Sequence, residues 1–447
     1  MRFEDMKQIL VSAAQKAGLE HYEIYFEQEE SIGVETLKQE ISSFSSGVGG
    51  GVCFRCIVDG KMGYASGESM TEADLAELVT RAISNARCID SEDEAVIFSG
   101  SPTYAKTEQS EIGLTDPAEL KQTALALQAM AYAESDKVGD GTQTYLMSGV
   151  SEVRLYNSYG LELSNRVGRT AAYLSAVVRE GDEAQEDDAS GLGSTVEALC
   201  ALPEKAVTGA LSKLGAVTIP SGKYAVVFRG EQFRQFLSVF SEAFSAKQAQ
   251  LGLSLLAGKE GQRVAASCIT ITDDPMREGH AMQAPFDGEG VATYKKNTVE
   301  QGILTTLLYD LSTAAKAGRA STGNGQKRGY ASAVSIAPYS FSIEAGDATE
   351  DELLRLAEGG VLITECKGFH AGANAVTGDF SIESAGFRIR DGKRAEPIKS
   401  FTVAGNFFTL LQEISRVGNE VRWSPLGGFT TFGSPDVLVT DMSIAGC

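Results

Sequence analysis

A single acidic residue stands where a short apolar segment meets a helical pattern. Tyr224–Phe228 indicates a buried strand, Arg229 and Gly230 interrupt it, and apolar residues then recur at helical spacing. Glu231 falls in the first helical turn, where backbone N–H groups point outward and a side chain is held rigidly. Its carboxylate could act as a lone acid in a cleft. A first-turn glutamate also stabilises a helix through the helix dipole, and we favour this structural role.

Two cysteine-containing pairs have spacings that occur in functional sites. Cys366 and His370 are four residues apart, a spacing at which a thiolate and an imidazole can share a metal. No third ligand accompanies them, so we favour a half-buried cysteine beside a surface histidine. Cys53 and Cys56 form a Cys-x-x-Cys in a predicted strand. Their odd separation places them on opposite faces of that strand, so structural cysteines are expected and not a redox pair.

Four acidic residues, Asp273, Asp274, Asp287 and Glu289, lie beside predicted turns. Their carboxylates offer the oxygen ligands that a divalent cation requires. Asp-Asp-Pro and Asp-Gly are also common turn-forming sequences. We therefore favour turns over a cation site for these four residues.

Polar residues flanked by glycine form a further candidate site. Thr377, Gly378 and Asp379 precede one predicted strand, and Gly405 and Asn406 follow the next. Glycine permits close approach of another backbone, which a peptide bound along a sheet edge would need. The sequence supports two interpretations equally here, a peptide-binding edge and two tight turns.

The elements that must position these residues predict an α+β fold. Residues 1–220 are expected to form antiparallel sheets backed by helices, and residues 221–447 a β-rich second domain with few helices, near 231–246, 311–318 and 350–358. Strands followed by a helix occur at 22–88 and again at 142–214, an order compatible with internal duplication.

Local signals define several boundaries in the first domain. Residues 21–29 and 32–41 are predicted as separate strands, and Asp59-Gly60 as a hairpin turn. Thr71 and Asp116 are expected to cap helices, the second with proline at its first helical position. Residues 180–188 are so acidic that a loop is expected.

Composition excludes some classes of protein. With 447 residues, 43% apolar, the chain is long enough for two or three globular domains. A formal charge of −21 argues against a nucleic-acid-binding surface. Seven scattered cysteines argue against a disulfide framework. The chain has no long apolar run, and its N-terminus is a mixed-charge amphipathic helix, so no membrane interaction and a cytoplasmic location are expected.

Six short motifs of the second half are specific in combination. Their order and spacing resemble the TldD/PmbA family, formerly described as modulators of DNA gyrase, and Ala-Gly-Phe and Val-Ala-Gly-Asn resemble its PmbA (TldE) branch. The motifs are Phe286–Gly290, Gly302–Leu304, Ser321–Asn324, Thr377–Ser381, Ala385–Phe387 and Thr402–Asn406. The resemblance covers nearly the whole chain.

The resemblance implies a metallopeptidase scaffold. In the TldD branch a His-Glu-x-x-x-His motif opens the helix after a buried strand, and its histidines and a downstream cysteine hold zinc. Residues 230–235 here read Gly-Glu-Gln-Phe-Arg-Gln, and residues 417–425 contain no cysteine. The only histidines, His21, His280 and His370, form no pair with helical spacing. No metal is therefore expected on this chain, and zinc is expected on a TldD-like partner.

These patterns lead to one main functional prediction and two alternatives. The chain is predicted to pair with a TldD-like subunit and to complete a chamber that degrades small or unfolded polypeptides. Whether it has enzymatic activity of its own stays open. The alternative is a non-enzymatic homodimer that binds peptides or a regulatory partner. Direct modulation of gyrase is the weakest of the three, because the acidic residues are scattered and not spaced like phosphates.

Overall fold

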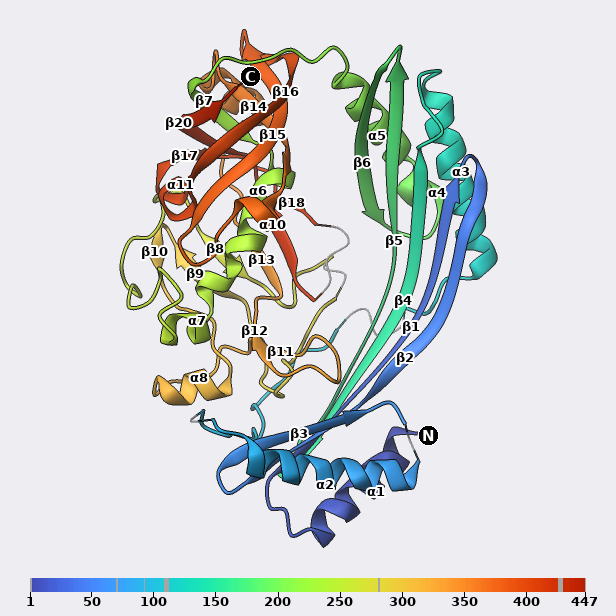
Figure 1. The fold of residues 1–447 in the computed structure, drawn as a ribbon, viewed down its shortest axis with the longest axis vertical. Helices are drawn as coiled ribbons and strands as arrows, with labels where there is room; N and C mark the ends of the chain where they lie inside the picture. Colours follow the sequence, from blue (N-terminus) through green and yellow to red (C-terminus); the bar gives the residue numbers. More distant parts are fainter. Residues whose placement is uncertain are drawn as a thin grey trace.

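A long, curved antiparallel sheet from the first half of the chain lies alongside a β-rich second half (Figure 1). The α+β fold expected from the sequence is confirmed. The structure is a computed structural model, which describes residues 2–69, 71–91, 93–107, 112–279, 282–424 and 429–446. Within these ranges, no helix combines the length and apolar character needed to cross a bilayer.

The first sheet has six strands in the order β3-β2-β1-β4-β5-β6. Two predictions about this sheet are wrong. Residues 21–29 and 32–41 were predicted as separate strands, but most of them form the single strand β1. The acidic segment 180–188 was predicted as a loop, but most of it lies in strand β6. Lys38 and Gln39, with φ of 51° and 61°, make a two-residue turn that no glycine signalled. The strands are β1 Tyr22–Leu37, β2 Glu40–Val58, β3 Lys61–Gly67, β4 Gln143–Asn157, β5 Glu162–Glu180 and β6 Glu183–Leu192.

One face of this sheet is covered by helices. Even-numbered apolar residues of β1, such as Ile24 and Val34, pack under them, whereas odd-numbered residues face the second half of the chain. The side chains of Thr71 and Asp116 cap two of the helices, as predicted, and positive φ at Asp59 and Gly60 confirms the hairpin turn. The helices are α1 Phe3–Lys16, α2 Glu72–Cys88, α3 Pro117–Glu134, α4 Val196–Leu199 and α5 Ala201–Ser212.

The order of elements in this half repeats itself. A helix, three strands and further helix occur from α1 to α2 and again from α3 to α5, and the two sets of strands meet where β1 pairs with β4. The expected duplication of 22–88 and 142–214 is compatible with this arrangement. It stays a prediction, because a repeated order of elements does not by itself show common origin.

The second half is built around a sheet in the order β16-β15-β14-β7-β20-β17, which a further β16–β20 pairing closes into a barrel. A smaller sheet, β10-β9-β8-β13-β19-β18, packs beside it. The strands are β7 Gly222–Phe228, β8 Ile271–Asp273, β9 Lys296–Glu300, β10 Ile303–Leu304, β11 Gly325–Gln326, β12 Ser335–Ile336, β13 Ser340–Ile343, β14 Val361–Lys367, β15 Asp379–Arg390, β16 Lys393–Asn406, β17 Ile414–Val417, β18 Arg422–Trp423, β19 Thr431–Ser434 and β20 Val437–Ala445.

The central helix of this half is shorter than predicted. Its apolar stripe, including Phe233, Phe236 and Phe240, is fully buried, but the α-helix ends at Phe240 and a 3-10 turn follows before the next helix. Helices near 311–318 and 350–358 are confirmed, whereas the short helices α7, α10 and α11 were not predicted. The helices are α6 Gly230–Phe240, α7 Ala246–Gln250, α8 Leu311–Lys316, α9 Glu350–Leu356, α10 Phe369–Gly372 and α11 Phe407–Glu413.

Candidate functional site

The passage from β7 into α6 is as tight as the sequence predicts. Only Arg229 separates the two elements, and the amide of Gly230 donates to Asp436 Oδ1 at 2.8 Å, which satisfies one helix-start N–H group. A Cβ atom on Gly230 would lie 2.2 Å from the carbonyl oxygen of Ser434. This position therefore accepts glycine and no larger residue without movement of the helix start.

Asp436 organises the charges around this junction. It is 4% exposed, and besides the Gly230 amide it pairs with Arg229 Nη1 at 3.2 Å and with Arg422 Nε at 3.2 Å. Arg229 also pairs with Glu350 at 2.7 Å. Sequence reasoning missed Asp436, since a Ser-Pro-Asp between two short strands gives only a turn signal. The structure shows that its carboxylate joins α6, β18 and the start of β20.

Glu231 faces the same network from the first turn of α6. Its Oε2 lies 3.4 Å from Arg422 Nε, and its Oε1 lies 3.9 Å from Nζ of Lys205 in α5. The side chain is 26% exposed, and Oε2 is buried without a hydrogen-bond partner. The favoured structural role at the helix start is compatible with this position, and the structure adds ion pairs to both halves of the chain.

A cavity of about 830 Å³ opens where these residues meet α5 and β6. It lies between the two halves of the chain, and its wall carries both positive and negative side chains. The guanidinium of Arg234 donates to the carbonyl oxygen of Trp423, and burial lowers the pKa of Arg234. The described lining contains no histidine or cysteine. Its walls can bind a polar chain through charges and hydrogen bonds.

The residues at the helix start do not fit the zinc site that the family resemblance describes. Gly230 has no room for a side chain, and Gln235 donates from Nε2 to Gln232 Oε1 at 2.8 Å. Across the described ranges no group of three or more His, Cys, Asp or Glu side chains is placed to hold a metal ion. His280 and Pro425 lie outside the described residues.

The cysteines occupy packed positions. Cys366 is buried, its Sγ lies 3.7 Å from Ser384 Oγ, and burial raises the pKa of its thiol to about 12. His370 is exposed on α10, so the interpretation as a packed cysteine and a surface histidine is supported, with Cys366 more deeply buried than expected. Cys53 and Cys56 pack into different clusters on opposite faces of β2, as predicted.

The five residues of the predicted peptide-binding edge come together in space. Asp379 and Asn406 are directly paired across β15 and β16, and Asn406 Nδ2 donates to Thr377 O at 2.8 Å and to Asp379 Oδ1 at 2.9 Å. Asn406 Oδ1 caps α11 by accepting from backbone amides of its first turn. Gly378 has a φ of +80°, which glycine adopts without strain, and a Cβ on Gly405 would lie 3.0 Å from the Phe380 ring. These bonds are internal, and none of the five lines the cavity at α6. Peptide binding there stays a prediction.

The four candidate acids divide into two kinds. Asp274 and Asp287 accept backbone N–H groups within turns, as predicted. The turn prediction is wrong for Asp273, which ends β8 fully buried and pairs with Lys296 at 3.2 Å. It is also incomplete for Glu289, which is 5% exposed. Local turn signals could not reveal these buried partners, which come from distant parts of the chain.

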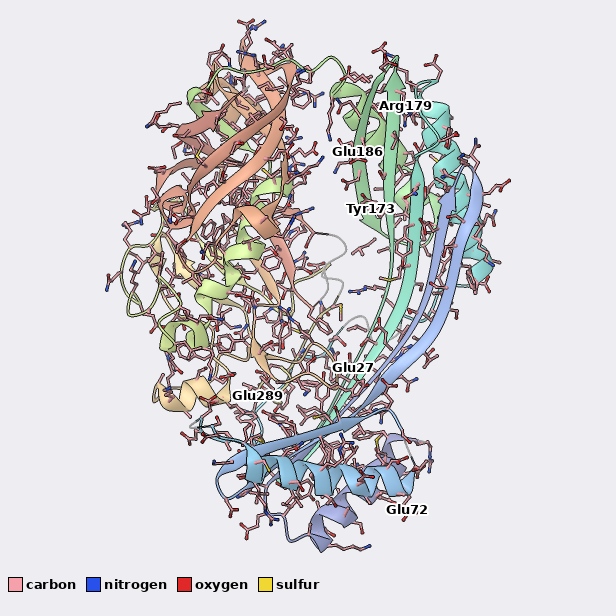
Figure 2. The ribbon with its side chains drawn as sticks, viewed as in Figure 1. Glu27, Glu72, Tyr173, Arg179, Glu186 and Glu289 are labelled. Atoms are coloured by element: carbon pink, nitrogen blue, oxygen red, sulfur yellow. The ribbon has the colours of Figure 1, made fainter. Side chains whose placement is uncertain are left out.

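Glu289 belongs to a buried charge cluster at the junction of the two halves (Figure 2). Its Oε1 lies 3.6 Å from Arg55 Nη1, and Arg55 pairs with Glu23 at 2.7 Å. Burial raises the pKa of Glu289 to about 8, although Arg55 acts in the opposite direction, and burial raises the pKa of Asp287 to about 7. Both carboxyls therefore keep their protons well above the ordinary range.

This cluster predicts that stability falls as pH rises. The folded protein keeps the Glu289 proton to about pH 8, whereas the unfolded chain loses it near the ordinary 4.5. Unfolding therefore releases protons in this window, and the free energy of unfolding decreases by roughly 1 kcal/mol per pH unit up to pH 8. Urea unfolding at several pH values measures the slope. Glu289→Gln, which mimics the protonated acid, is expected to flatten it, and an unchanged slope in this variant contradicts the prediction.

Comparison with known proteins agrees with this architecture. Residues 221–446 match the family model of the PmbA/TldA metallopeptidase C-terminal domain, residues 22–86 match domain 1, and residues 111–214 match the central domain. The metalloprotease PmbA of Escherichia coli O157:H7 is 23% identical over 93% of this chain and 90% of its own. A metalloprotease of Methanothermobacter thermautotrophicus is 28% identical over 86% of this chain and 84% of its own.

Solved structures share the fold. A Thermotoga maritima protein, provisionally named a modulator of a DNA gyrase, superimposes with a TM-score of 0.89 at 28% identity and covers 99% of this chain and 100% of its own. TldE from Thermococcus kodakarensis also reaches a TM-score of 0.89, at 22% identity, over 99% of this chain and 100% of its own.

The fold is α+β, and the matching family models place the protein in the metallopeptidase-like class. The chain belongs to the PmbA/TldD metallopeptidase family.

Proposed function

We propose that this chain is the subunit of a PmbA/TldD-type metallopeptidase complex that does not hold the catalytic zinc. It pairs with a TldD-like subunit, and hydrolysis takes place on that partner. Its own contribution is to enclose the chamber and to guide a small or unfolded polypeptide. A cytoplasmic location belongs to this proposal, and the acidic composition is compatible with it.

The observation that supports this most directly is the chemistry at the start of α6. A metallopeptidase helix of this family supplies two imidazoles and a general base. Here Gly230 and Gln235 stand in the two imidazole positions. The carboxylate of Glu231 is paired with Arg422 and Lys205, so two protein cations already compensate its charge.

The cavity supports a role in handling peptides. With about 830 Å³ it accommodates a few residues of an extended chain and excludes a folded domain. Mixed charges along the wall suit backbone amides and varied side chains better than one specific ligand. Asp188 on β6 interacts electrostatically with Arg234 of the other half, and both line this cavity.

Co-purification and peptidase assays test the proposal. A TldD-like chain produced together with this one is expected to co-purify at a one-to-one ratio and to cleave casein or unfolded peptides. This chain alone is expected to be inactive. A self-dimer that does not bind the TldD-like chain but captures peptides without cleaving them supports the alternative, a non-enzymatic binding protein. Cleavage by this chain alone contradicts both.

A further inference from the structure

A second, smaller pocket lies on the inner face of the long sheet, apart from the cavity at α6. It has a volume of about 90 Å³. Glu27 of β1 pairs with Val153 of β4, which pairs with Asn165 of β5, so Glu27 and Asn165 lie in one row across the sheet and on one face. Figure 2 shows Glu27 on the side turned toward the second half. Gln326 of β11 faces this row from that half.

Three buried oxygen atoms in this lining have no hydrogen-bond partner. They are Glu27 Oε2, Asn165 Oδ1 and Gln326 Oε1. The orientation of both amides is fixed, because Asn165 Nδ2 donates to Gln283 O at 2.9 Å and Gln326 Nε2 donates to Pro338 O at 2.7 Å. Each unsatisfied buried acceptor costs about 1–3 kcal/mol. Three acceptors in one small pocket therefore indicate an occupant that donates hydrogen bonds.

The charges of the lining indicate that this occupant is positive. Among the described lining residues, Glu27 and Asp287 are the carboxylates, and Lys327 is the one ammonium, which donates to Ser332 O at 2.6 Å. Burial raises the pKa of Glu27, although a backbone hydrogen bond from Tyr330 and the charge of Lys327 act in the opposite direction. Asp287 already accepts from three backbone N–H groups, and burial raises its pKa to about 7. Glu27 is therefore the carboxyl of this lining that has a free oxygen for a cation.

The remaining walls are mostly apolar, with Ser151 and Gln283 as the polar exceptions. Aliphatic and aromatic side chains surround the acceptors, which suits a hydrocarbon stem ending in a donor group. Aromatic faces also favour a nearby cation. The apolar and aromatic lining residues are Tyr25, Val153, Val167, Met282, Phe286, Tyr339 and Phe429.

We propose that this pocket binds a primary alkylammonium group, as carried by the lysine side chain of a bound peptide. An ammonium has three donors, which match the three free acceptors. The volume of about 90 Å³ admits one side chain of this size. That the ammonium arrives on a peptide rests on the proposed function, whereas the ammonium preference rests on the pocket alone.

Binding of matched short peptides to the full chain tests the pocket. Fluorescence anisotropy compares Nα-acetylated peptides that differ only in carrying lysine, norleucine or arginine at one position. The lysine peptide is expected to bind about tenfold tighter than the norleucine peptide. The ammonium could come from a lysine side chain or from the N-terminus of a peptide, and a norleucine peptide with a free N-terminus distinguishes the two. If this peptide binds more tightly than the lysine peptide, the pocket is assigned to a peptide N-terminus. Equal affinities across the set, or a gain for arginine only, overturn the proposal and leave ordered water as the occupant.

A pair of variants localises the preference. Glu27→Gln keeps the shape of the side chain and removes its charge, and it is expected to abolish the tenfold lysine preference. Glu29→Gln is the matched control, because Glu29 follows on the same face of β1, is exposed and lies outside this lining. Thermal unfolding verifies that both variants fold. Retention of the preference in Glu27→Gln overturns the assignment.

This binding assay is independent of hydrolysis. Failure of the chain to support cleavage with a TldD-like partner refutes the proposed function and leaves the lysine preference intact. Loss of the lysine preference, with cleavage preserved, refutes only the pocket.

Discussion

Replacing Gly230 and Gln235 by histidine, which rebuilds the family's metal-binding sequence, is expected to destabilise the protein and not to create a zinc site. The cause is steric. A Cβ at position 230 meets the carbonyl oxygen of Ser434 at 2.2 Å, and that oxygen belongs to backbone at the end of β19. The helix start must therefore shift, at a cost of about 3 kcal/mol in the free energy of unfolding. Urea unfolding and zinc titration measure both effects.

Two single changes separate the steric effect from general loss of glycine. Gly230→Ala carries the clash without an imidazole and is expected to lose nearly as much stability as the double variant. Gly47→Ala is the control, because a Cβ at Gly47 meets no atom within 4 Å. Tight zinc binding by the double variant at unchanged stability would show that the helix start is adaptable and that only the residue types prevent metal binding.

Removing the carboxylate of Asp436 is expected to have an even larger effect on stability. Asp436→Ala leaves Arg229 and Arg422 without their shared buried partner and leaves the Gly230 amide unsatisfied. Breaking a buried pair by truncating one partner costs about 3–5 kcal/mol, and the lost helix-start hydrogen bond adds to this. Because α6 and β18 both depend on this carboxylate, the wall of the cavity is also expected to loosen.

Asp441 provides the matched control for this variant. Its carboxylate pairs with Lys223 at 2.6 Å, but both side chains are more than half exposed. Solvent screening makes such pairs nearly neutral, so Asp441→Ala is expected to unfold like the wild type. Limited proteolysis of the Asp436→Ala variant is expected to begin at α6 or β18. Equal stabilities of the two variants contradict the assigned role of Asp436.

Sequence reasoning recovered the parts of the fold that local chemistry dictates. Thr71 and Asp116 cap helices because their side chains accept hydrogen bonds from nearby backbone amides. Asp59 and Gly60 form a turn because both adopt positive φ. Long strands were divided because polar residues on an outward face resemble a loop. The acidic segment 180–188 illustrates this, since most of it lies in edge strand β6 with alternate side chains in solvent.

The candidate site was predictable only in part. The position of Glu231 after a buried strand followed from apolar periodicity, because both elements are local. The residues around it come from segments far apart in the sequence. They are its ion-pair partners Lys205 and Arg422, and Asp436, which also pairs with Arg422. Glu289 was predicted as a turn residue for the same reason, because its partner Arg55 lies in the other half of the chain and gives no local signal.

The zinc content of the purified chain tests the central proposal most directly. We expect elemental analysis to find far less than one zinc per chain, and a complex with a TldD-like subunit to contain zinc on that subunit and to lose peptidase activity with a chelator. One tightly held zinc per chain, together with chelator-sensitive cleavage by this chain alone, would contradict the proposal that it is the zinc-free half of the complex.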